Sequence, residues 1–255
     1  MVSRQFISTI GLVTAAALLA ACSSVPEEQR TDLRDKYENG NRAIFDFNMG
    51  LDSYVLEPVA SGYRTVVPEG GQTAIGNHLN WASLPSTAIN STLQGKFENA
   101  GLATLHFLVN GLTLGFVDLT EDDEPVQPED FGQTLAAANV PEGSYMMVPV
   151  LGPRTTRSLA GDVIDFVLNP LGVLGSGDAA QSVITAQRPV GAVSFRAKNF
   201  DAFNDVKYNA LDPYARTRSV YYQTRTGLLE DRVTGSIDDA DSDDAFLDFL
   251  EEDTN

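Results

Sequence analysis

Residues 97–119, FENAGLATLHFLVNGLTLGFVDL, form the most apolar stretch of the chain after its first 21 residues. A helix built from this stretch would be apolar on nearly every face, which is typical of an element that is deeply buried or in contact with lipid. The residues that interrupt the pattern are Gly101, His106, Asn110, Gly111 and Gly115. They argue against a plain transmembrane span, and because glycine permits unusual backbone conformations, they predict broken helices with close backbone approach.

The side chains of His106 and Trp81 can each be interpreted in two ways. His106, inside the apolar stretch, is either a hydrogen-bonded core residue or a group that lines a pore. Trp81 is the only tryptophan of the chain. It either packs in the core or lies at a membrane–water boundary, where indole rings are enriched.

Helical spacing of apolar residues recurs on both sides of this stretch. Upstream, the spacing predicts a helix over 41–58 that ends at Pro58, and two short helices within 73–94 that are separated by Pro85. Downstream, it predicts a helix over 158–175 and one or two helices over 179–211. A last amphipathic helix over 213–229 opens with Pro213 in its first turn.

The remaining segments are irregular in pattern. Residues 121–130 carry six acidic residues and two prolines, which predicts a solvated loop, and the Gly- and Pro-rich residues 131–157 are expected to be mostly irregular. No segment alternates polar and apolar residues for long enough to require a sheet. The sequence therefore predicts an all-α fold with irregular Gly/Pro-rich segments.

The two ends of the chain differ from its body. Arg4 and the apolar run 10–21 form a secretory signal that is too short to span a bilayer. Residues 19–22, Leu-Ala-Ala-Cys, resemble a bacterial lipobox, and Cys22 is the only cysteine of the chain. The alternative is an ordinary signal peptide with an incidental cysteine. We expect a signal peptide over 1–21, an acylated tether over 22–40, one helical domain over 41–232, and a disordered acidic C-terminal tail over 233–255.

The charge of the chain excludes several functions. The 255 residues include 35 acidic and 17 basic residues, for a formal net charge of −18. Nucleic acid binding is excluded, because phosphates require clusters of Lys and Arg. The same charge disfavours simple electrostatic docking to anionic lipid. If the protein sits on a membrane, a covalent lipid on Cys22 would hold it there.

A catalytic site is not found in the sequence. The chain has two histidines, no G-x-S-x-G elbow, and no Cys/His set at zinc spacing. Gly175-Ser176-Gly177 is too short for a phosphate-binding loop. Asp162 and Asp165 share a helix face, which a solvated face explains. We therefore predict that the protein is not an enzyme and uses no metal or cofactor.

Arginines and tyrosines gather on the predicted last helix. Arg216, Arg218 and Arg225 lie around Tyr221 and Tyr222, and Tyr221 shares a face with Arg225. One interpretation is a contact to phosphate or to a partner, because a guanidinium presents a planar fork of donors. The other is ion pairing with the many carboxylates of this chain.

Five segments, in order over residues 41–229, resemble the MlaA (VacJ) lipoprotein family. They are 41–48 (NRAIFDFN) with 52, 58–60, 63–64 and 67–68; 77–90 with 93–95 (LQG); 107–110 (FLVN); 130–135 (DFGQTL) with 143, 145, 149 and 151–153 (LGP); and 212–214 (DPY) with 218, 221, 223 and 225. The chain departs from the family pattern at His106 and Ser158, and in a shorter glycine-rich segment after Asn110.

The resemblance implies a ring-like, single-domain body of amphipathic helices in the inner leaflet of the outer membrane, anchored through Cys22 on the periplasmic face. Such proteins ride on trimeric porins and surround a polar channel. Mislocalised outer-leaflet phospholipids enter this channel and pass to a soluble periplasmic carrier, MlaC, which maintains lipid asymmetry. The alternatives are a structural lipoprotein that scaffolds the envelope and a phospholipase or cell-wall hydrolase.

The resemblance also suggests functional residues, for each of which simple packing is the alternative. The first group is expected to set the first helix in the leaflet and consists of Asn41, Phe45, Phe47 and Asn48. The second is expected to shape the pore or its gate and consists of Asn110, Gly111 and Gly115. The third is expected to fix the last helix or to meet the carrier and consists of Tyr214, Arg218, Tyr221 and Arg225.

Overall fold

The computed structural model of the protein describes residues 31–120, 125–168 and 178–230. The signal peptide, Cys22, the acidic tail and Gly175-Ser176-Gly177 lie outside these ranges. In chain order the helices and strands are α2 (Glu38–Leu51), a π-helical turn (Asp52–Leu56), α3 (Glu57–Val66), α4 (Glu69–Leu93), α5 (Phe97–Asn110), a 3₁₀ turn (Gly111–Thr113), α6 (Phe131–Ala137), β1 (Tyr145–Val148), β2 (Gly152–Thr155), α7 (Thr156–Leu168), α9 (Asp178–Lys198), α10 (Phe200–Tyr208) and α11 (Pro213–Leu229).

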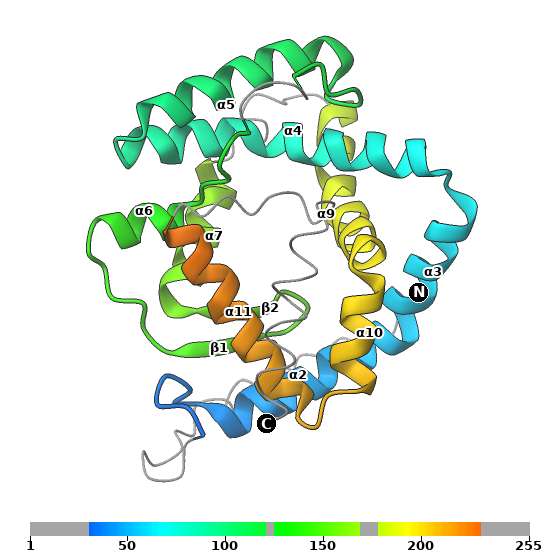
Figure 1. Cartoon of the computed structure of the whole chain (residues 1–255), viewed down its shortest axis with the longest axis vertical. Helices are drawn as coiled ribbons and strands as arrows, with labels where there is room; N and C mark the ends of the chain where they lie inside the picture. Colours follow the sequence, from blue (N-terminus) through cyan, green and yellow to red (C-terminus); the bar gives the residue numbers. More distant parts are fainter. Residues whose placement is uncertain (1–30, 121–124, 169–177, 231–255) are drawn as a thin grey trace.

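The helices follow one another around a ring (Figure 1). The chain runs along α2 and α3, crosses the top through α4 and α5, and passes through α6, the strands and α7 on the far side. Within the ring α9 packs on both α3 and α4, and α10 packs on α11. The predicted all-α, ring-like class is therefore confirmed.

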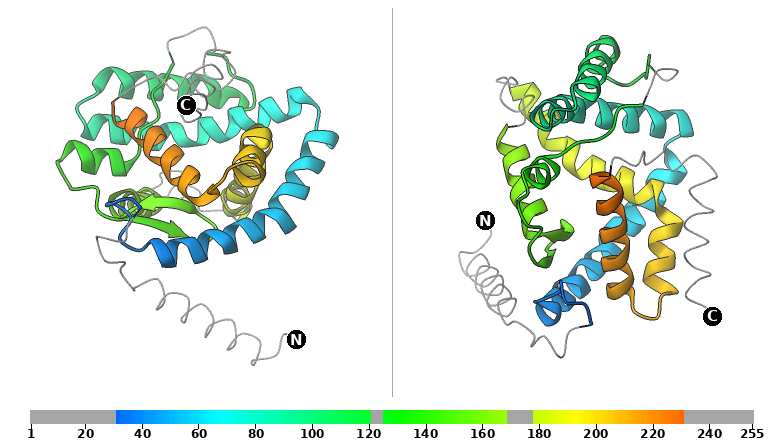
Figure 2. Two further views of the ribbon diagram at one scale, coloured as in Figure 1. Left: turned by 60° about the horizontal axis from the view of Figure 1, so that its bottom comes forward. Right: turned by 60° about the vertical axis from the view of Figure 1, so that its left-hand side comes forward.

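Pro58 does not end the first helix, contrary to the expectation from sequence. Helical backbone continues from α2 through the π-helical turn into α3, where Pro58 occupies the first turn. The two helices form one curved rod in the left view of Figure 2. The π-helical turn changes the backbone hydrogen-bond pattern just before the proline. Pro58 therefore lies in the first turn of α3, where the absence of its backbone N–H costs little.

Pro85 likewise fails to separate two helices. α4 is one helix of 25 residues with Pro85 inside it. A proline in a helix interior removes one backbone hydrogen bond, here the one to the carbonyl of Trp81. The part of α4 that leads into α5 lies side by side with α5 in Figures 1 and 2. We attribute the continuity to this packing, which outweighs the local loss.

The segment 131–157 is more regular than expected. Asp130 caps α6 by accepting a hydrogen bond from the Gln133 N–H at 2.8 Å. β1 and β2 then form a two-stranded antiparallel hairpin in which Tyr145 pairs with Thr155 and Val148 pairs with Gly152. The strands are four residues each, too short to show a period-2 pattern in the sequence.

Three other expectations are met by the structure. The helix of 97–110 ends at Asn110, Leu114 is left-handed with a φ of 53°, and Gly115 has a φ of 74°. Residues 179–211 form two helices, α9 and α10. α11 begins at Pro213 directly after Asp212, whose carboxylate accepts from the Ala215 N–H at 3.1 Å.

Residues 31–37, part of the segment expected to be a tether, lie against the ring. The Thr31 hydroxyl donates to the Glu38 carboxylate at 2.8 Å, and Asp35 is completely buried. Within the described residues, none of the helices has both the length and the apolarity needed to cross a bilayer.

Candidate functional site

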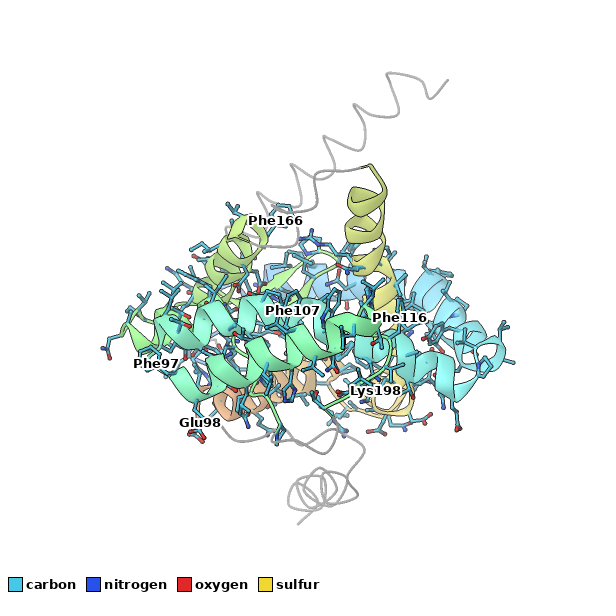
Figure 3. The ribbon with its side chains drawn as sticks, turned by 90° about the horizontal axis from the view of Figure 1, so that it is seen from above. Phe97, Glu98, Phe107, Phe116, Phe166 and Lys198 are labelled. Carbon is cyan, nitrogen blue, oxygen red and sulfur yellow. The ribbon has the colours of Figure 1, made fainter. Side chains whose placement is uncertain are left out.

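The distribution of polar and apolar side chains on α5 is the reverse of the distribution that is usual on a helix of a water-soluble protein. Its buried face carries Ala100, Ala103, His106 and Asn110. The solvent-exposed face carries large apolar side chains, among them Phe97, Leu105 and Leu108. Figure 3 looks onto this edge of the ring, with Phe97 near one end of α5 and Phe116 beyond the other. Small and polar residues therefore face the protein, and large apolar residues face outward.

α7 has the same division. Ser158, Asp162 and Asp165 lie on one face, and Val163 and Val167 are exposed on the opposite face. Asp165 accepts hydrogen bonds from the Ser86 hydroxyl at 3.0 Å, the Asn90 amide at 2.9 Å and the Phe131 N–H at 2.8 Å. Asp165 is thus bonded to the rest of the ring and is not the solvated side chain that the sequence suggested, whereas the Asp162 side chain is 39% exposed.

The first turns of α11 are anchored by a buried carboxylate. Asp35 accepts from Arg218 Nη1 at 2.5 Å and from the Tyr214 hydroxyl, and its second oxygen accepts from the Asn41 amide at 2.7 Å. Burial and the neighbouring carboxylate raise the pKa of the Tyr214 hydroxyl far above its usual value. This buried cluster joins α11 to the residues before α2, and the ion-pairing interpretation of Arg218 accounts for its contacts.

The middle of α11 is anchored to β2, to α7 and to the N-terminal cap of α6. The Tyr221 hydroxyl lies 2.9 Å from Ser158 Oγ and accepts from the Thr155 N–H at 3.0 Å. Arg225 forms a two-pronged ion pair with Asp130. Burial acts to raise the pKa of the Asp130 carboxyl, but the hydrogen bonds and charge of Arg225 outweigh it and hold that pKa below its usual value.

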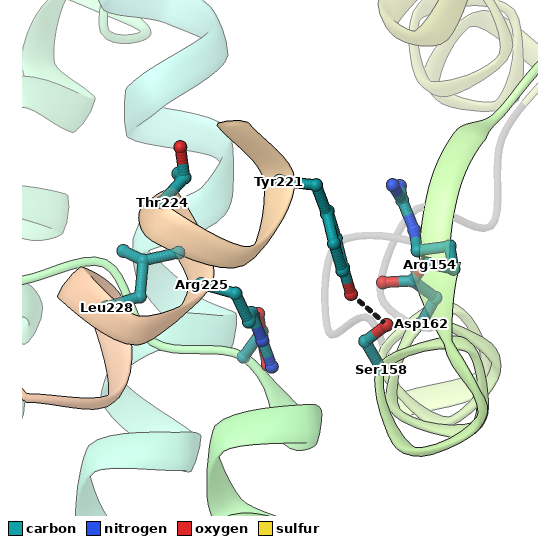
Figure 4. A pocket seen from close by; sticks show the side chains of 8 residues that line it. Arg154, Ser158, Asp162, Tyr221, Thr224, Arg225 and Leu228 are labelled. Carbon is teal, nitrogen blue, oxygen red and sulfur yellow. Dashed lines mark hydrogen bonds and ion pairs between the residues drawn. The ribbon is translucent and has the colours of Figure 1, made fainter. Parts of the chain in front are cut away.

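A cavity of about 230 Å³ lies between α11 and the segment formed by β2 and α7 (Figure 4). Its walls carry two arginines, Arg154 and Arg225, and two aspartates, Asp130 and Asp162. Ser158, Tyr221 and Thr224 complete the polar lining.

The break after α5 is held against α4 by Trp81. The Trp81 indole N–H donates to the Phe107 carbonyl at 2.9 Å, and the indole stacks on the Phe107 ring with centroids 5.1 Å apart. A Cβ built on Gly115 would lie 2.4 Å from Trp81 Cβ. Glycine is therefore required at position 115 for two reasons. Its φ is positive, and the backbone lies too close to Trp81 to leave room for a Cβ. These contacts support the packing interpretation of Trp81.

His106 and Asn110 make buried hydrogen bonds to the residues that follow the break. The Asn110 amide donates to Asp118 at 2.9 Å and to Thr120 at 3.0 Å, while its oxygen accepts from the Leu119 N–H at 2.7 Å. His106 Nδ1 lies 3.1 Å from Thr120 Oγ1. These contacts support the hydrogen-bonded core interpretation of His106.

We predict that Gly115→Ala displaces the break from Trp81. The new methyl group would collide with the indole, so we expect a loss of about 2–3 kcal/mol of stability from overpacking together with backbone strain. Because Trp81 is the only tryptophan, its fluorescence reports directly on this contact. We expect a shift of the emission toward that of a more exposed indole, together with a lower Tm.

Gly95→Ala is the matched control for this prediction. Gly95 has a φ of 78°, but a Cβ built on it meets nothing within 4 Å. Gly95→Ala therefore carries the backbone strain without the collision. An unchanged emission spectrum in Gly115→Ala, or equal losses of Tm in the two variants, would contradict the prediction.

The structure places the first group of predicted site residues mostly against the hairpin. The Asn41 amide accepts from the Met147 N–H at 2.9 Å, and Phe45 is a core residue whose ring contacts Tyr214 edge-on. Asn48 donates to the Val148 carbonyl at 3.0 Å and accepts from the Val150 N–H at 2.8 Å. Phe47 alone points outward, with 57% of its surface exposed.

The second group of predicted site residues lies together, whereas the third group is divided between two places. Asn110, Gly111 and Gly115 lie together at the break, and Gly111 is beside the Trp81 indole. Tyr214 and Arg218 meet the residues before α2, whereas Tyr221 and Arg225 border the cavity.

Sequence reasoning missed Asp35, Arg154 and the role of Asp162. Asp35 was assigned to the tether, and Arg154 is one of several scattered bases without a helical or motif position. The spacing of Asp162 and Asp165 was the available signal, but spacing alone does not tell a bonded face from a solvated one. Within the described residues no group of His, Cys, Asp and Glu side chains is arranged to hold a metal ion.

Comparison with known proteins gives consistent matches over the ring. The sequence model of the MlaA lipoprotein family matches residues 33–227. The chain is 30% identical over 220 residues to the intermembrane phospholipid transport system lipoprotein MlaA of Haemophilus influenzae, covering 83% of this chain and 86% of that protein. It is 27% identical over 219 residues to the protein of the same name from Escherichia coli, covering 83% and 84% of the two chains.

A solved structure shares the fold. It is reported under the words "Structural basis for maintenance of bacterial outer membrane lipid asymmetry" and matches with a TM-score of 0.67 at 29% identity, covering 76% of this chain and 98% of that one. An uncharacterized protein of Rickettsia bellii is 32% identical over 205 residues, which is 78% of each chain.

Proposed function

This chain belongs to the MlaA lipoprotein family, and from that membership we propose that it lets mislocalised outer-leaflet phospholipids pass along a polar path toward a periplasmic carrier. In this role it maintains the lipid asymmetry of the outer membrane, and it is a transport component and not an enzyme. The observation that carries the proposal is the reversed polarity of the ring, in which α5 and α7 bury polar residues and expose large apolar ones.

The physical need for such a ring follows from the cost of moving a phospholipid. A charged head group cannot cross hydrocarbon cheaply without a wet or polar route. A ring of two-faced helices offers polar side chains on the inside and apolar side chains toward the acyl chains of the bilayer. Irregular backbone, such as the break at Asn110–Gly115, is tolerated at membrane depth where protein or a polar cavity covers it.

The exposed apolar side chains support a position in the inner leaflet of the outer membrane. They form an apolar rim on three parts of the ring. It consists of Phe47, Tyr54, Val55 and Val59 on α2 to α3; Leu93, Phe97, Leu105, Leu108, Leu112 and Phe116 on α4 to the break; and Val163, Phe166 and Val167 on α7. Burying such a rim in lipid is favourable by about 25 cal/mol per Å² of apolar surface.

Attachment in this proposal comes from acyl chains on Cys22 on the periplasmic face. A net charge of −18 gives no electrostatic attraction to anionic lipid, whereas two or more acyl chains anchor a protein stably. Phe47 and the residues of the break would meet lipid, and Asn41, Phe45 and Asn48 would hold α2 in place. A trimeric porin and the carrier MlaC are the proposed partners.

A strain that lacks this protein tests the proposal. We expect phospholipid to accumulate in the outer leaflet, measured by labelling surface-exposed phospholipid on intact cells. The full chain should restore the parental level, whereas Cys22→Ser, which cannot be acylated, should not and should leave the membrane fraction. The full chain should also co-purify with a trimeric porin.

Two results would favour the alternatives. Unchanged lipid asymmetry in the deletion strain would favour a scaffolding lipoprotein. Hydrolysis of a labelled phospholipid by the purified chain would favour a phospholipase.

A further inference from the structure

We infer that the cavity between α11 and α7 binds the head group of a zwitterionic phospholipid that carries a primary ammonium group. Arg154 would bind the phosphate and Asp162 the ammonium. The inference rests on the proposed function, because it names the lipid class that the path accepts. The observation behind it is an arginine and an aspartate that line the same small cavity, each with hydrogen-bonding capacity to spare.

The size of the cavity fits a head group without its acyl chains. Its volume of about 230 Å³ lies below the ~300–1,000 Å³ of pockets that hold drug-sized ligands. Figure 4 shows Tyr221 and Arg225 reaching in from α11, and Arg154, Ser158 and Asp162 on the other side. Acyl chains would remain outside, and the exposed Phe166 lies one helical turn beyond Asp162 on α7.

Arg154 and Asp162 keep free hydrogen-bonding atoms. Arg154 Nε donates to one Asp162 oxygen at 2.5 Å, and Nη1 donates to the Pro153 carbonyl at 2.7 Å. Within the described residues, Arg154 Nη2 and the second Asp162 oxygen have no hydrogen-bond partner. Their side chains are 28% and 39% exposed, so a ligand can reach both.

The other charged pair of the cavity is closed and acts as a wall. Arg225 uses both terminal nitrogens on the two oxygens of Asp130, and its side chain is almost fully buried. The Tyr221 hydroxyl is held by Ser158 and by the Thr155 N–H. These fixed groups set the shape of the cavity and leave Arg154 and Asp162 as its ligand-binding pair.

The charges select a zwitterion over an anion. Because Arg154 and Asp162 neutralise each other, a phosphate bound to Arg154 Nη2 would add an uncompensated negative charge beside Asp162, whereas an ammonium on the second Asp162 oxygen restores the balance. The chain as a whole carries a net charge of −18, which further disfavours an anionic head group. The Arg154–Asp162 pair can stay intact, because the ligand uses the atoms that this pair leaves free.

Binding of short-chain lipids to the purified, acylated full chain in detergent tests the inference. The probes are dihexanoyl phosphatidylethanolamine, which has a primary ammonium, and dihexanoyl phosphatidylglycerol, which has none. Titration calorimetry should show about tenfold tighter binding of the ethanolamine lipid, the value of one charge-assisted hydrogen bond. Asp162→Asn should remove this preference, and Arg154→Gln should weaken binding of both lipids about tenfold.

Asp205→Asn is the matched control. Asp205 is 34% exposed and pairs with a single arginine, Arg216, at 2.9 Å, but it does not line the cavity. It should leave the preference unchanged. Circular dichroism and Tm of each variant separate a lost site from a lost fold. Asp162→Glu, which keeps the charge, should keep the preference.

Equal affinity for the two lipids, no binding of either, or an unchanged preference in Asp162→Asn would overturn the inference. The proposed function has its own readout in the deletion strain. Accumulated outer-leaflet phospholipid together with no head-group preference would refute the site alone. A selective site in a chain whose deletion leaves asymmetry intact would refute the proposed function alone.

Discussion

Gly161→Ala is expected to destabilise the ring by about 3 kcal/mol, at the upper end of the cost of overpacking. Gly161 of α7 crosses Gly132 of α6 so closely that an added Cβ would lie 2.3 Å from the Gly132 nitrogen and 2.7 Å from its Cα. Because these atoms are backbone, no side chain can move aside and the helices must separate. Thermal unfolding should show a Tm about 6–12 °C lower.

The separation would also reach α11. Asp130 caps α6 two residues before Gly132 and holds Arg225 of α11. Gly161→Ala should therefore disturb the cavity as well as the fold, and it should fail to restore lipid asymmetry in the deletion strain.

Gly101→Ala is the control for this prediction. Gly101 lies inside α5, and a Cβ built on it meets nothing within 4 Å. Since alanine is the better helix former, this variant should gain roughly 0.5–1 kcal/mol. A Gly161→Ala variant as stable as the parent protein would show that α6 and α7 do not pack as described.

Arg218→Met is expected to cost about 3–5 kcal/mol, the loss seen when one partner of a buried ion pair is removed. Asp35 is 0% exposed, and Arg218 is the cation that neutralises it at 2.5 Å. Methionine fills much of the volume of the arginine side chain but leaves the carboxylate charged and buried. Denaturant unfolding at neutral pH measures the loss.

A double variant identifies the cause of that loss. Asp35→Asn combined with Arg218→Met removes the uncompensated charge, and the remaining amide oxygen can still accept from one of the two donors, the Tyr214 hydroxyl or the Asn41 amide. The double variant should be more stable than Arg218→Met alone by 1 kcal/mol or more. A double variant with the summed losses of the two single variants would contradict a direct pairing.

Arg64→Met provides the exposed counterpart. Arg64 and Asp201 are 3.9 Å apart, with side chains 41% and 89% exposed. Such a pair contributes about 0–1 kcal/mol. The difference in lost stability between Arg218→Met and Arg64→Met therefore measures the effect of burying the ion pair.

The prolines show where local sequence signals were insufficient. Pro58 and Pro85 both predicted helix ends, and both lie within continuous helical segments. The cost of a proline is local and fixed, but the gain from continuing the helix depends on what the next turns pack against. α3 packs on α9 and α4 packs on α5, and neither partner is visible in the sequence around the proline.

The break at Asn110–Gly115 shows the opposite case. Here the local sequence is sufficient to predict the break, because a φ of 74° at Gly115 suits glycine and few other residues. The glycines therefore predicted both the broken helix and the close approach, although the partner of that approach, Trp81, came only from the structure.

The sequence by itself determined the all-helical class, the family, the break after α5 and the start of α11 at Asp212-Pro213. The family rests on five short segments in order along the chain, and the other three rest on residues within a turn or two of one another, where backbone preference and apolar spacing act directly. The tertiary structure alone decided that Arg218 neutralises Asp35, 183 residues away, and that Arg154 and Asp162 share a cavity with Arg225. An acidic chain offers each arginine many possible carboxylates, and only the path of the backbone selects which one it meets.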